Sequence, residues 1–246
     1  MNNILFYQLI LLFFFIFEKN FARFCNKEYC AGVDNGTAAL YIALRCLGIG
    51  PGDEVIVPVQ TFIASVSPIK ECRAKPVFVD VDENSLIDVT KIEEKINERT
   101  KAIIPVHLYG NVCNMNKIME IATRYNLKII EDCAQAHGSE YKGKIVPMGD
   151  VGCFSFFPGK SLGAYGDGGG IVSNNKEFID KCKKFSNHGR DKKYLHDTDG
   201  FNFRLDTLQA AILDVKLKHL NNWIQKKREI ARMYENGFKG VVEFII

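Results

Sequence analysis

The stretch CFSFFPGKSLGAYGDGGGIVS, residues 153–173, holds a single lysine, Lys160, directly after an apolar run typical of a strand. The run breaks at Pro158-Gly159, and five glycines lie between Lys160 and Gly170. Glycine has no side chain to keep a bulky group away. A lysine that serves only solubility needs no such surroundings, whereas a lysine that forms an imine with a planar cofactor does. The stretch therefore predicts a covalent cofactor site at Lys160.

The composition is that of an ordinary globular protein. The chain has 246 residues, 47% hydrophobic and 25% charged, with a formal net charge of +3. The small charge and the lack of a basic run exclude the electrostatic signature of nucleic-acid binding. The eight cysteines form no Cys-x-x-Cys pair, and several lie in apolar runs. We expect free, buried thiols in a reducing compartment, the cytoplasm, and neither disulfides nor a metal site.

The N-terminus is unusual, because residues 4–17, ILFYQLILLFFFIF, are almost wholly apolar. The run falls short of the ~20 residues that a transmembrane helix needs. It also lacks a preceding Lys or Arg and a following cleavage site of small residues, so it is a poor signal peptide. We treat residues 1–17 as an atypical apolar segment and expect an exposed tail that does not target a membrane.

Strand-like and helical patterns alternate from about residue 36 onward, which predicts an α/β fold with a mainly parallel sheet flanked by helices. Helices are expected near residues 39–47, 88–100 and 115–126, and amphipathic helices after residue 175. In such sheets ligands bind outside the carboxyl ends of the strands. The predicted strands are short, continuous and rich in Val and Ile: 54–58, 76–81, 101–108, 127–132, 152–157 and 169–173.

Two polar positions follow a predicted strand in the stretch EDCAQAHG, residues 131–138. Asp132 is either a helix cap or the partner of a pyridinium nitrogen, the charge that pyridoxal chemistry needs on its ring. Gln135 lies close behind it. With Lys160 about thirty residues later, the second interpretation of Asp132 gains weight.

A phosphate site is predicted at residues 35–40, NGTAAL, where a helix begins. Free N–H groups at a helix start favour an anion, and Gly36 allows it to come close; a plain N-cap fits equally well. The hydroxyl of Ser155 could join the same phosphate. Phe62 could stack on an aromatic ring, although a lone phenylalanine is more often core. Together these residues supply every part that pyridoxal phosphate requires.

The chain resembles the DegT/DnrJ/EryC1/StrS family, nucleotide-sugar aminotransferases with the aspartate aminotransferase fold, also called fold type I of the pyridoxal-phosphate enzymes. The matching stretches cover residues 17–237: NGTAALYIALRCLGIGPGDEVIVPVQTFIAS, AKPVFVDVD, TKAIIPVHLYGN, IIEDCAQAHGSEYKGK, GDVGCFSFFPGKSLGAYGDGGGIVSN, NHGR and GFNFRLDTLQAAIL.

The resemblance implies a role for each site residue. Lys160 would form the imine and move the proton, and Asp132 would pair with the ring nitrogen. Relatives that catalyse dehydration carry histidine in place of the lysine, so Lys160 favours transamination. The remaining implied contacts are with the ring hydroxyl by Gln135, the ring face by Phe62, the phosphate by Gly36, Thr37 and Ser155, and the phosphate of a neighbouring subunit by Asn202.

The resemblance also implies substrates and domains. Glutamate would donate the amine to a keto sugar nucleotide, with details of the motifs pointing to dTDP-linked 3-keto-6-deoxy hexoses, in surface polysaccharide or amino-sugar biosynthesis. The enzyme would be a homodimer. Residues 18–220 would form the cofactor-binding large domain and 221–246 the start of a C-terminal small domain that is largely missing. Two alternatives are a catalytically inactive truncated remnant and a membrane-tethered or secreted binding protein.

Overall fold

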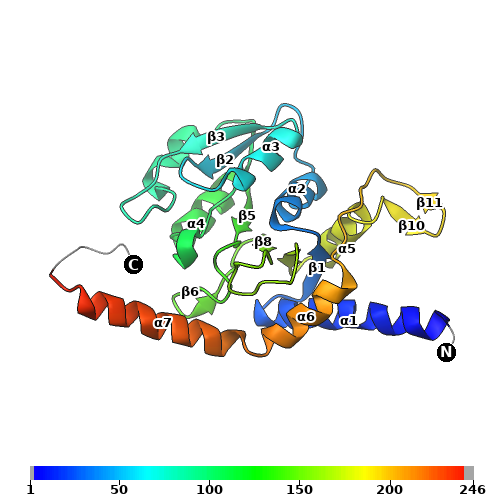
Figure 1. The fold of residues 1–246 in the computed structure, drawn as a ribbon. Coiled ribbons are helices and arrows are strands. Elements are labelled where there is room, and N and C mark those ends of the chain that lie inside the picture. The colour runs from blue at the N-terminus through cyan, green and yellow to red at the C-terminus, as the bar shows by residue number, and fades with distance from the viewer. Residues whose placement is uncertain (1–2, 241–246) are drawn as a thin grey trace.

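The protein is built on a seven-stranded sheet, seen in a computed structural model that describes residues 3–240, with side chains from residue 12 onward (Figure 1). The strand order is β1-β9-β8-β5-β4-β2-β3. Neighbours from β3 to β8 run parallel, while β9 is antiparallel to both β8 and β1. The strands are β1 (Tyr29–Val33), β2 (Glu54–Pro58), β3 (Lys75–Val79), β4 (Thr100–Ile103), β5 (Lys128–Asp132), β8 (Val151–Ser155) and β9 (Gly169–Ser173). The predicted mainly parallel sheet is confirmed, and β1 is the strand that the sequence patterns missed.

The helices and the small hairpins complete the fold. The α-helices are α1 (Asn3–Phe24), α2 (Gly36–Cys46), α3 (Ser67–Glu71), α4 (Met115–Tyr125), α5 (Lys176–Phe185), α6 (Thr207–Leu217) and α7 (Leu220–Gly237). Short 3-10 turns are η1 (Ile63–Ser65), η2 (Val89–Lys91), η3 (Glu93–Lys95) and η4 (Leu108–Gly110). Two hairpins stand apart from the main sheet: β6 (Glu140–Tyr141) with β7 (Lys144–Ile145), and β10 (Arg190–Lys192) with β11 (Leu195–His196).

Alternating side chains of β8 and β9 serve two hydrophobic cores. Cys153 and Ile171 belong to the core beneath α2 and α5, whereas Phe154 and Val172 belong to the core beneath α1 and α6. Successive strand residues point to opposite faces, so this end of the sheet is buried on both sides. That explains why these strands are continuous apolar runs.

Helix α1 corrects the expectation of an exposed tail at residues 4–17 only for the end of that segment. The segment is helical, and Phe17 at its end is fully buried beside Phe21. The ring of Phe21 meets Phe154 and Phe156 edge to face, each with centroids 5.0 Å apart. Leu12, Phe13 and Phe15 are exposed, and the side chains of residues 4–11 lie outside the described part. Among the described helices, none is long and apolar enough to cross a membrane.

Two predicted elements differ from the structure. Residues 88–100 form the turns η2 and η3 in place of a helix, because the Asp88 carboxylate binds both the N–H and the hydroxyl of Thr90. Such local side-chain bonds compete with helix formation. The strand expected over 101–108 ends at Ile103, and Pro105, which has no N–H, follows.

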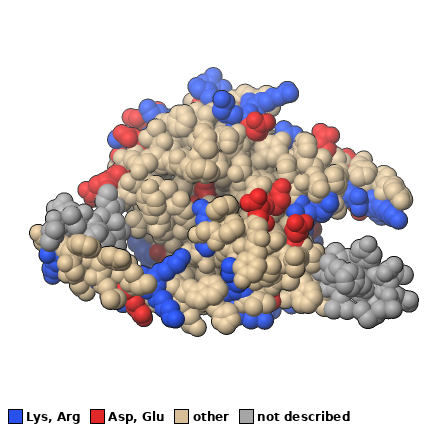
Figure 2. Space-filling view, viewed as in Figure 1, with Lys and Arg blue, Asp and Glu red and all other residues tan. Residues whose placement is uncertain are grey.

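The amphipathic helices after residue 175 are present, but the apolar stripe that the sequence indicates at Leu205, Leu208, Ile212 and Val215 is not the buried face of α6. Ala210 and Leu213 form its buried side, whereas Leu208 and Val215 are exposed. All eight cysteines are free, and all but Cys46 are buried, as predicted. On the face shown in Figure 2, acidic and basic side chains are interspersed.

Candidate cofactor site

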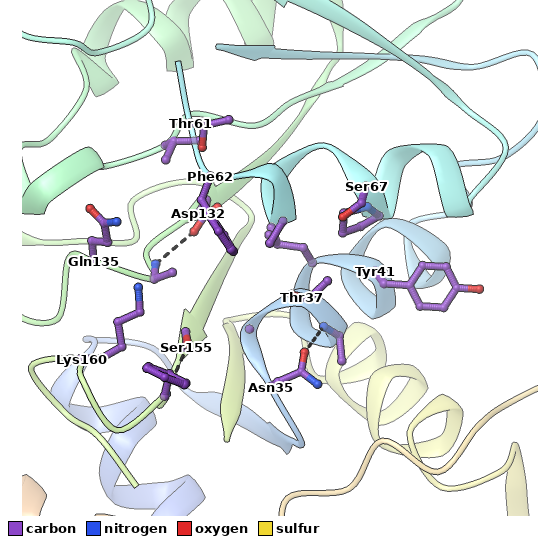
Figure 3. A pocket seen from close by; sticks show the side chains of 18 of the residues that line it. Asn35, Thr37, Tyr41, Thr61, Phe62, Ser67, Asp132, Gln135, Ser155 and Lys160 are labelled. Carbon is purple, nitrogen blue, oxygen red and sulfur yellow. Dashed lines mark hydrogen bonds between the residues drawn. The ribbon is translucent and has the colours of Figure 1, made fainter. Parts of the chain in front are cut away.

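A cavity of about 860 Å³ opens at the carboxyl ends of β2, β5 and β8. This is the edge of a parallel sheet where ligands are expected. Figure 3 shows the Lys160 side chain reaching into the cavity, with Asp132 and Gln135 near its tip. The structure brings seven of the eight candidate residues to its lining: Gly36, Thr37, Phe62, Asp132, Gln135, Ser155 and Lys160.

Asp132, the last residue of β5, is only 6% exposed and is held by hydrogen bonds. The N–H of Ala134 donates to Oδ1 at 3.1 Å, and the hydroxyl of Ser65 donates to Oδ2 at 2.6 Å. The backbone is fixed as well, because its N–H donates to Pro105 and its carbonyl accepts from His107. The carboxylate is thus immobile at the cavity wall, whereas a helix cap would bind the free N–H groups of a helix.

Gln135 is oriented by the turn after β4. The backbone N–H of Tyr109 donates to Gln135 Oε1 at 2.6 Å. Tyr109 can present that N–H because its backbone adopts a left-handed conformation, with φ of 57°. With Oε1 occupied, the amide of Gln135 faces the cavity with its NH₂ group free to donate to a ligand oxygen.

The start of α2 forms the opposite side of the cavity. The Asn35 side chain caps the helix by accepting from the N–H of Ala38 at 2.8 Å. The earlier N–H groups of the first turn remain available to an anion. Gly36 is required there, since a Cβ at this position would lie 2.7 Å from the Cβ of Ser155.

Lys160 sits in a tight loop after β8. Its backbone N–H donates to the carbonyl of Phe157 at 2.9 Å. Gly163 lets the loop close, because a Cβ there would meet the carbonyl oxygen of Pro158 at 2.4 Å. The glycines around the lysine therefore shape the loop as well as leaving room beside the amine.

His137 lies buried close to this loop, between the rings of Phe154 and Phe156. Neither imidazole nitrogen has a hydrogen-bond partner among the described residues. Burial, together with the charge of Lys160, lowers the pKa of His137 to about 3. The ring is therefore neutral near pH 7 and adds no second charge beside the lysine.

Phe62 and Asn202 differ in their relation to the cavity. Phe62 is 69% exposed at the lining, so it is not the core residue that a lone phenylalanine usually is. Asn202 is exposed and forms a bridge with Asn187; it does not line the cavity, although its neighbours Phe201 and Phe203 do. Within one chain the structure does not bring Asn202 to the other candidates.

A second polar group lies behind the site, where His107, Glu131 and Cys133 are within 4.8 Å of one another and fully buried. His107 Nε2 lies 2.8 Å from Glu131 Oε2, and Glu131 Oε1 accepts from the N–H groups of Met148 and Gly149. Both carboxylate oxygens are thus engaged. We interpret the group as a hydrogen-bond network that ties the loops around β5 together.

The sequence patterns missed Ser65 and Thr61, which connect to Asp132. Both lie in the stretch PVQTFIAS, from which only Phe62 was selected. A signal was present, because two hydroxyl residues follow the carboxyl end of β2. Their spacing of four residues brings the two oxygens within 2.7 Å once the turn η1 forms.

Solved structures share this architecture. The structure of DesV from Streptomyces venezuelae, described as a complex with a ketimine intermediate, matches with a TM-score of 0.90 and 44% identity, over 92% of this chain and 62% of that one. NtdA from Bacillus subtilis, solved with bound cofactor PMP, matches with a TM-score of 0.83 and 38% identity, over 95% and 55%. The fold is the large domain of the fold type I transferases.

The sequence comparisons identify the family. Residues 15–246 match the model of the DegT/DnrJ/EryC1/StrS aminotransferase family, and the chain belongs to it. A dTDP-3-amino-3,6-dideoxy-alpha-D-galactopyranose transaminase of Aneurinibacillus thermoaerophilus is 53% identical over 91% of this chain and 62% of its own length. A dTDP-3-amino-3,4,6-trideoxy-alpha-D-glucose transaminase of Streptomyces venezuelae is 44% identical over 92% and 60%. The chain thus spans about three-fifths of these relatives.

Proposed function

We propose that the chain is the cofactor-binding part of a pyridoxal 5'-phosphate-dependent aminotransferase that moves an amino group from glutamate to a keto sugar nucleotide. The observation that carries the proposal is that Lys160 and Asp132 line the same cavity, whose volume is about 860 Å³. An amine and a fixed carboxylate at the same cavity are what a lysine-bound pyridine ring requires.

The residues present fit this cofactor. The start of α2 and the hydroxyl of Ser155 would hold the phosphate, since glycine at position 36 keeps the two close together. The exposed ring of Phe62 offers a flat apolar surface for the pyridine ring, and Gln135 has an NH₂ group to give to the ring hydroxyl. Asn202 would act on the partner subunit of a homodimer, consistent with its exposed position.

The mechanism assigns each residue a physical task. The bound cofactor supplies an electron sink for the substrate carbon. Asp132, whose Oδ2 accepts from Ser65, would supply a negative charge to the ring nitrogen. Lys160 would hold the cofactor through Nζ and, when free, would carry a proton at that atom. Phe62 and the loop after β8, which line the cavity, would limit the access of water to a bound cofactor.

The family and its named relatives support a nucleotide sugar as the amine acceptor, and the motifs favour a dTDP-linked 3-keto-6-deoxy hexose. We place residues 18–220 in the cofactor domain and 221–246 at the start of the C-terminal region. The free cysteines support a cytoplasmic location. The competing proposal is that the chain is catalytically inactive.

The test is to incubate the purified chain with pyridoxal phosphate, record its visible spectrum, and then add glutamate. We expect a visible band that glutamate converts to the colourless amine form. Asp132→Asn should keep the band but slow the conversion at least ~100-fold, because it removes a preorganised charge from a dry site. A chain that stays colourless overturns the proposal, and a coloured chain that ignores glutamate supports the catalytically inactive alternative.

A further inference from the structure

Two hydroxyl groups form a chain of hydrogen bonds that ends on Asp132. The hydroxyls of Thr61 and Ser65 lie 2.7 Å apart, and Ser65 Oγ lies 2.6 Å from Asp132 Oδ2. Thr61 lines the cavity, while Ser65 is only 1% exposed and belongs to the turn η1 behind it. Both residues follow β2, and Asp132 ends β5, so the chain of bonds joins two strand ends.

The direction of these bonds follows from hydrogen counting. An ionised carboxylate accepts only, so Ser65 must donate its single hydroxyl hydrogen to Asp132. Thr61 must then donate to the oxygen of Ser65. The polarity runs from Thr61 through Ser65 to the carboxylate, and each bond strengthens the next.

Ser65 is in a position to fix the orientation of Asp132 and to donate to its charged form. A donor on Oδ2, together with the N–H of Ala134 on Oδ1, prevents rotation of the carboxylate. Hydrogen bonds to a charged form stabilise that form. A carboxylate stabilised in this way competes less well for the proton of a neighbouring pyridinium.

We propose that Ser65, supported by Thr61, is a positioning residue that keeps the proton on the cofactor's ring nitrogen and off Asp132. The inference rests on the proposed function, because it needs a pyridine ring beside Asp132. Ser65 touches neither substrate nor cofactor and acts only through Asp132. Removing its hydroxyl should therefore weaken the electron sink without removing any contact to the substrate.

The chain offers a matched control two residues further along. Ser67 lines the same cavity, but its hydroxyl donates to the carbonyl of Ile63 at 3.2 Å and does not contact Asp132. Ser65→Ala and Ser67→Ala remove the same atom from the same segment. Thr61→Val preserves side-chain shape, leaves Ser65 in place, and provides a second variant should Ser65→Ala fail to fold.

The experiment reconstitutes each variant with pyridoxal phosphate labelled with ¹⁵N in the ring and records the ¹⁵N NMR shift. We expect Ser65→Ala to move the shift toward the unprotonated ring and to slow conversion by saturating glutamate about tenfold, the size expected for a hydrogen bond to a charged group. Thr61→Val should change the ¹⁵N shift and the conversion rate in the same direction, but by smaller amounts. Ser67→Ala should match the wild type, and the half-saturating glutamate concentration should change little in any variant.

The outcomes separate the two claims. A wild-type chain that fails to hold the labelled cofactor overturns the proposed function and this inference with it. A wild-type chain that binds, with a protonated ring nitrogen in both Ser65→Ala and Thr61→Val, overturns the inference and leaves the proposed function standing. Equal shifts in Ser65→Ala and Ser67→Ala also overturn it, because a general disturbance of the segment would then explain both.

Discussion

The two terminal helices contrast in how they meet the rest of the molecule. Helix α1 lies alongside α6, while α7 extends away from them (Figure 1). Phe17 and Phe21 of α1 are fully buried in the second core. In α7 only Leu220 is buried, and Ile230, Met233 and Tyr234 are more than half exposed.

The more apolar of the two helices is the one that packs against the sheet, and its C-terminal turns make that contact. The apolar segment of α1 suggested a loose tail, yet its last turns cover Phe154 and Phe156, the residues on either side of Ser155. Polar groups reinforce the contact, since Glu18 accepts from the N–H of Gly32 at 2.8 Å and pairs with Lys183 at 2.5 Å. Helix α1 therefore supports the strand end that carries part of the candidate site.

The largest effect should come from removing the buried ring of α1. We expect Phe21→Ala to lower the free energy of unfolding by about 3–5 kcal/mol, the range for emptying a fully buried phenylalanine site. Ile230→Ala in α7 should change it by no more than about 0.5 kcal/mol, because the side chain is already 51% exposed. Urea denaturation of the two variants compares them directly. Similar losses in both would mean that α1 and α7 are packed to the same extent.

A smaller effect, dependent on pH, is expected from Glu18. Burial raises the pKa of its carboxyl above the ordinary value of 4.5, although Lys183 and the N–H of Gly32 oppose the rise. A raised folded pKa gives stability that is complete below the unfolded pKa and is lost as pH rises through the folded pKa. Glu18→Gln removes this titration.

The stability of Glu18→Gln relative to the wild type should therefore increase as the pH rises from 4.5 toward neutral. Urea denaturation at a series of pH values measures the difference, and Glu235→Gln on the exposed surface of α7 serves as the control. A difference that falls with rising pH would show that the ion pair with Lys183 outweighs burial and would reverse the assignment.

The sheet was predictable because its strands, apart from the edge strand β3, are mostly buried, which leaves continuous apolar runs such as EVIVP at 54–58. Strand β1 was missed because its sequence, YCAGV, is short and contains the small residues Ala31 and Gly32. Its pairing with β9 is what identifies it as a strand. The outward face of α6 could not be foreseen either. The predicted stripe includes Leu208 and Val215, whereas the buried face is formed by Ala210 and Leu213. Tertiary packing decides which face of an amphipathic helix is buried.

The sequence patterns selected Lys160 and Asp132, and the structure brings both to the lining of one cavity. The candidate site was not predictable where the task depends on contact between distant segments. Ser65 meets Asp132 across a separation of 67 residues, and the N–H of Tyr109 meets Gln135 only because of a left-handed turn. The contact of Asn202 with a partner subunit's cofactor stays a prediction, because Asn202 does not line the cavity of its own chain.

The most direct measurement of the central claim is to find which lysine holds the cofactor. The chain would be loaded with pyridoxal phosphate, reduced with borohydride, digested and mapped by mass spectrometry. The account predicts the pyridoxyl group on Lys160, at the cavity shared with Asp132, and its loss in Lys160→Arg with the fold retained. Label on another lysine, with Lys160 unmodified in the wild-type chain, would contradict it.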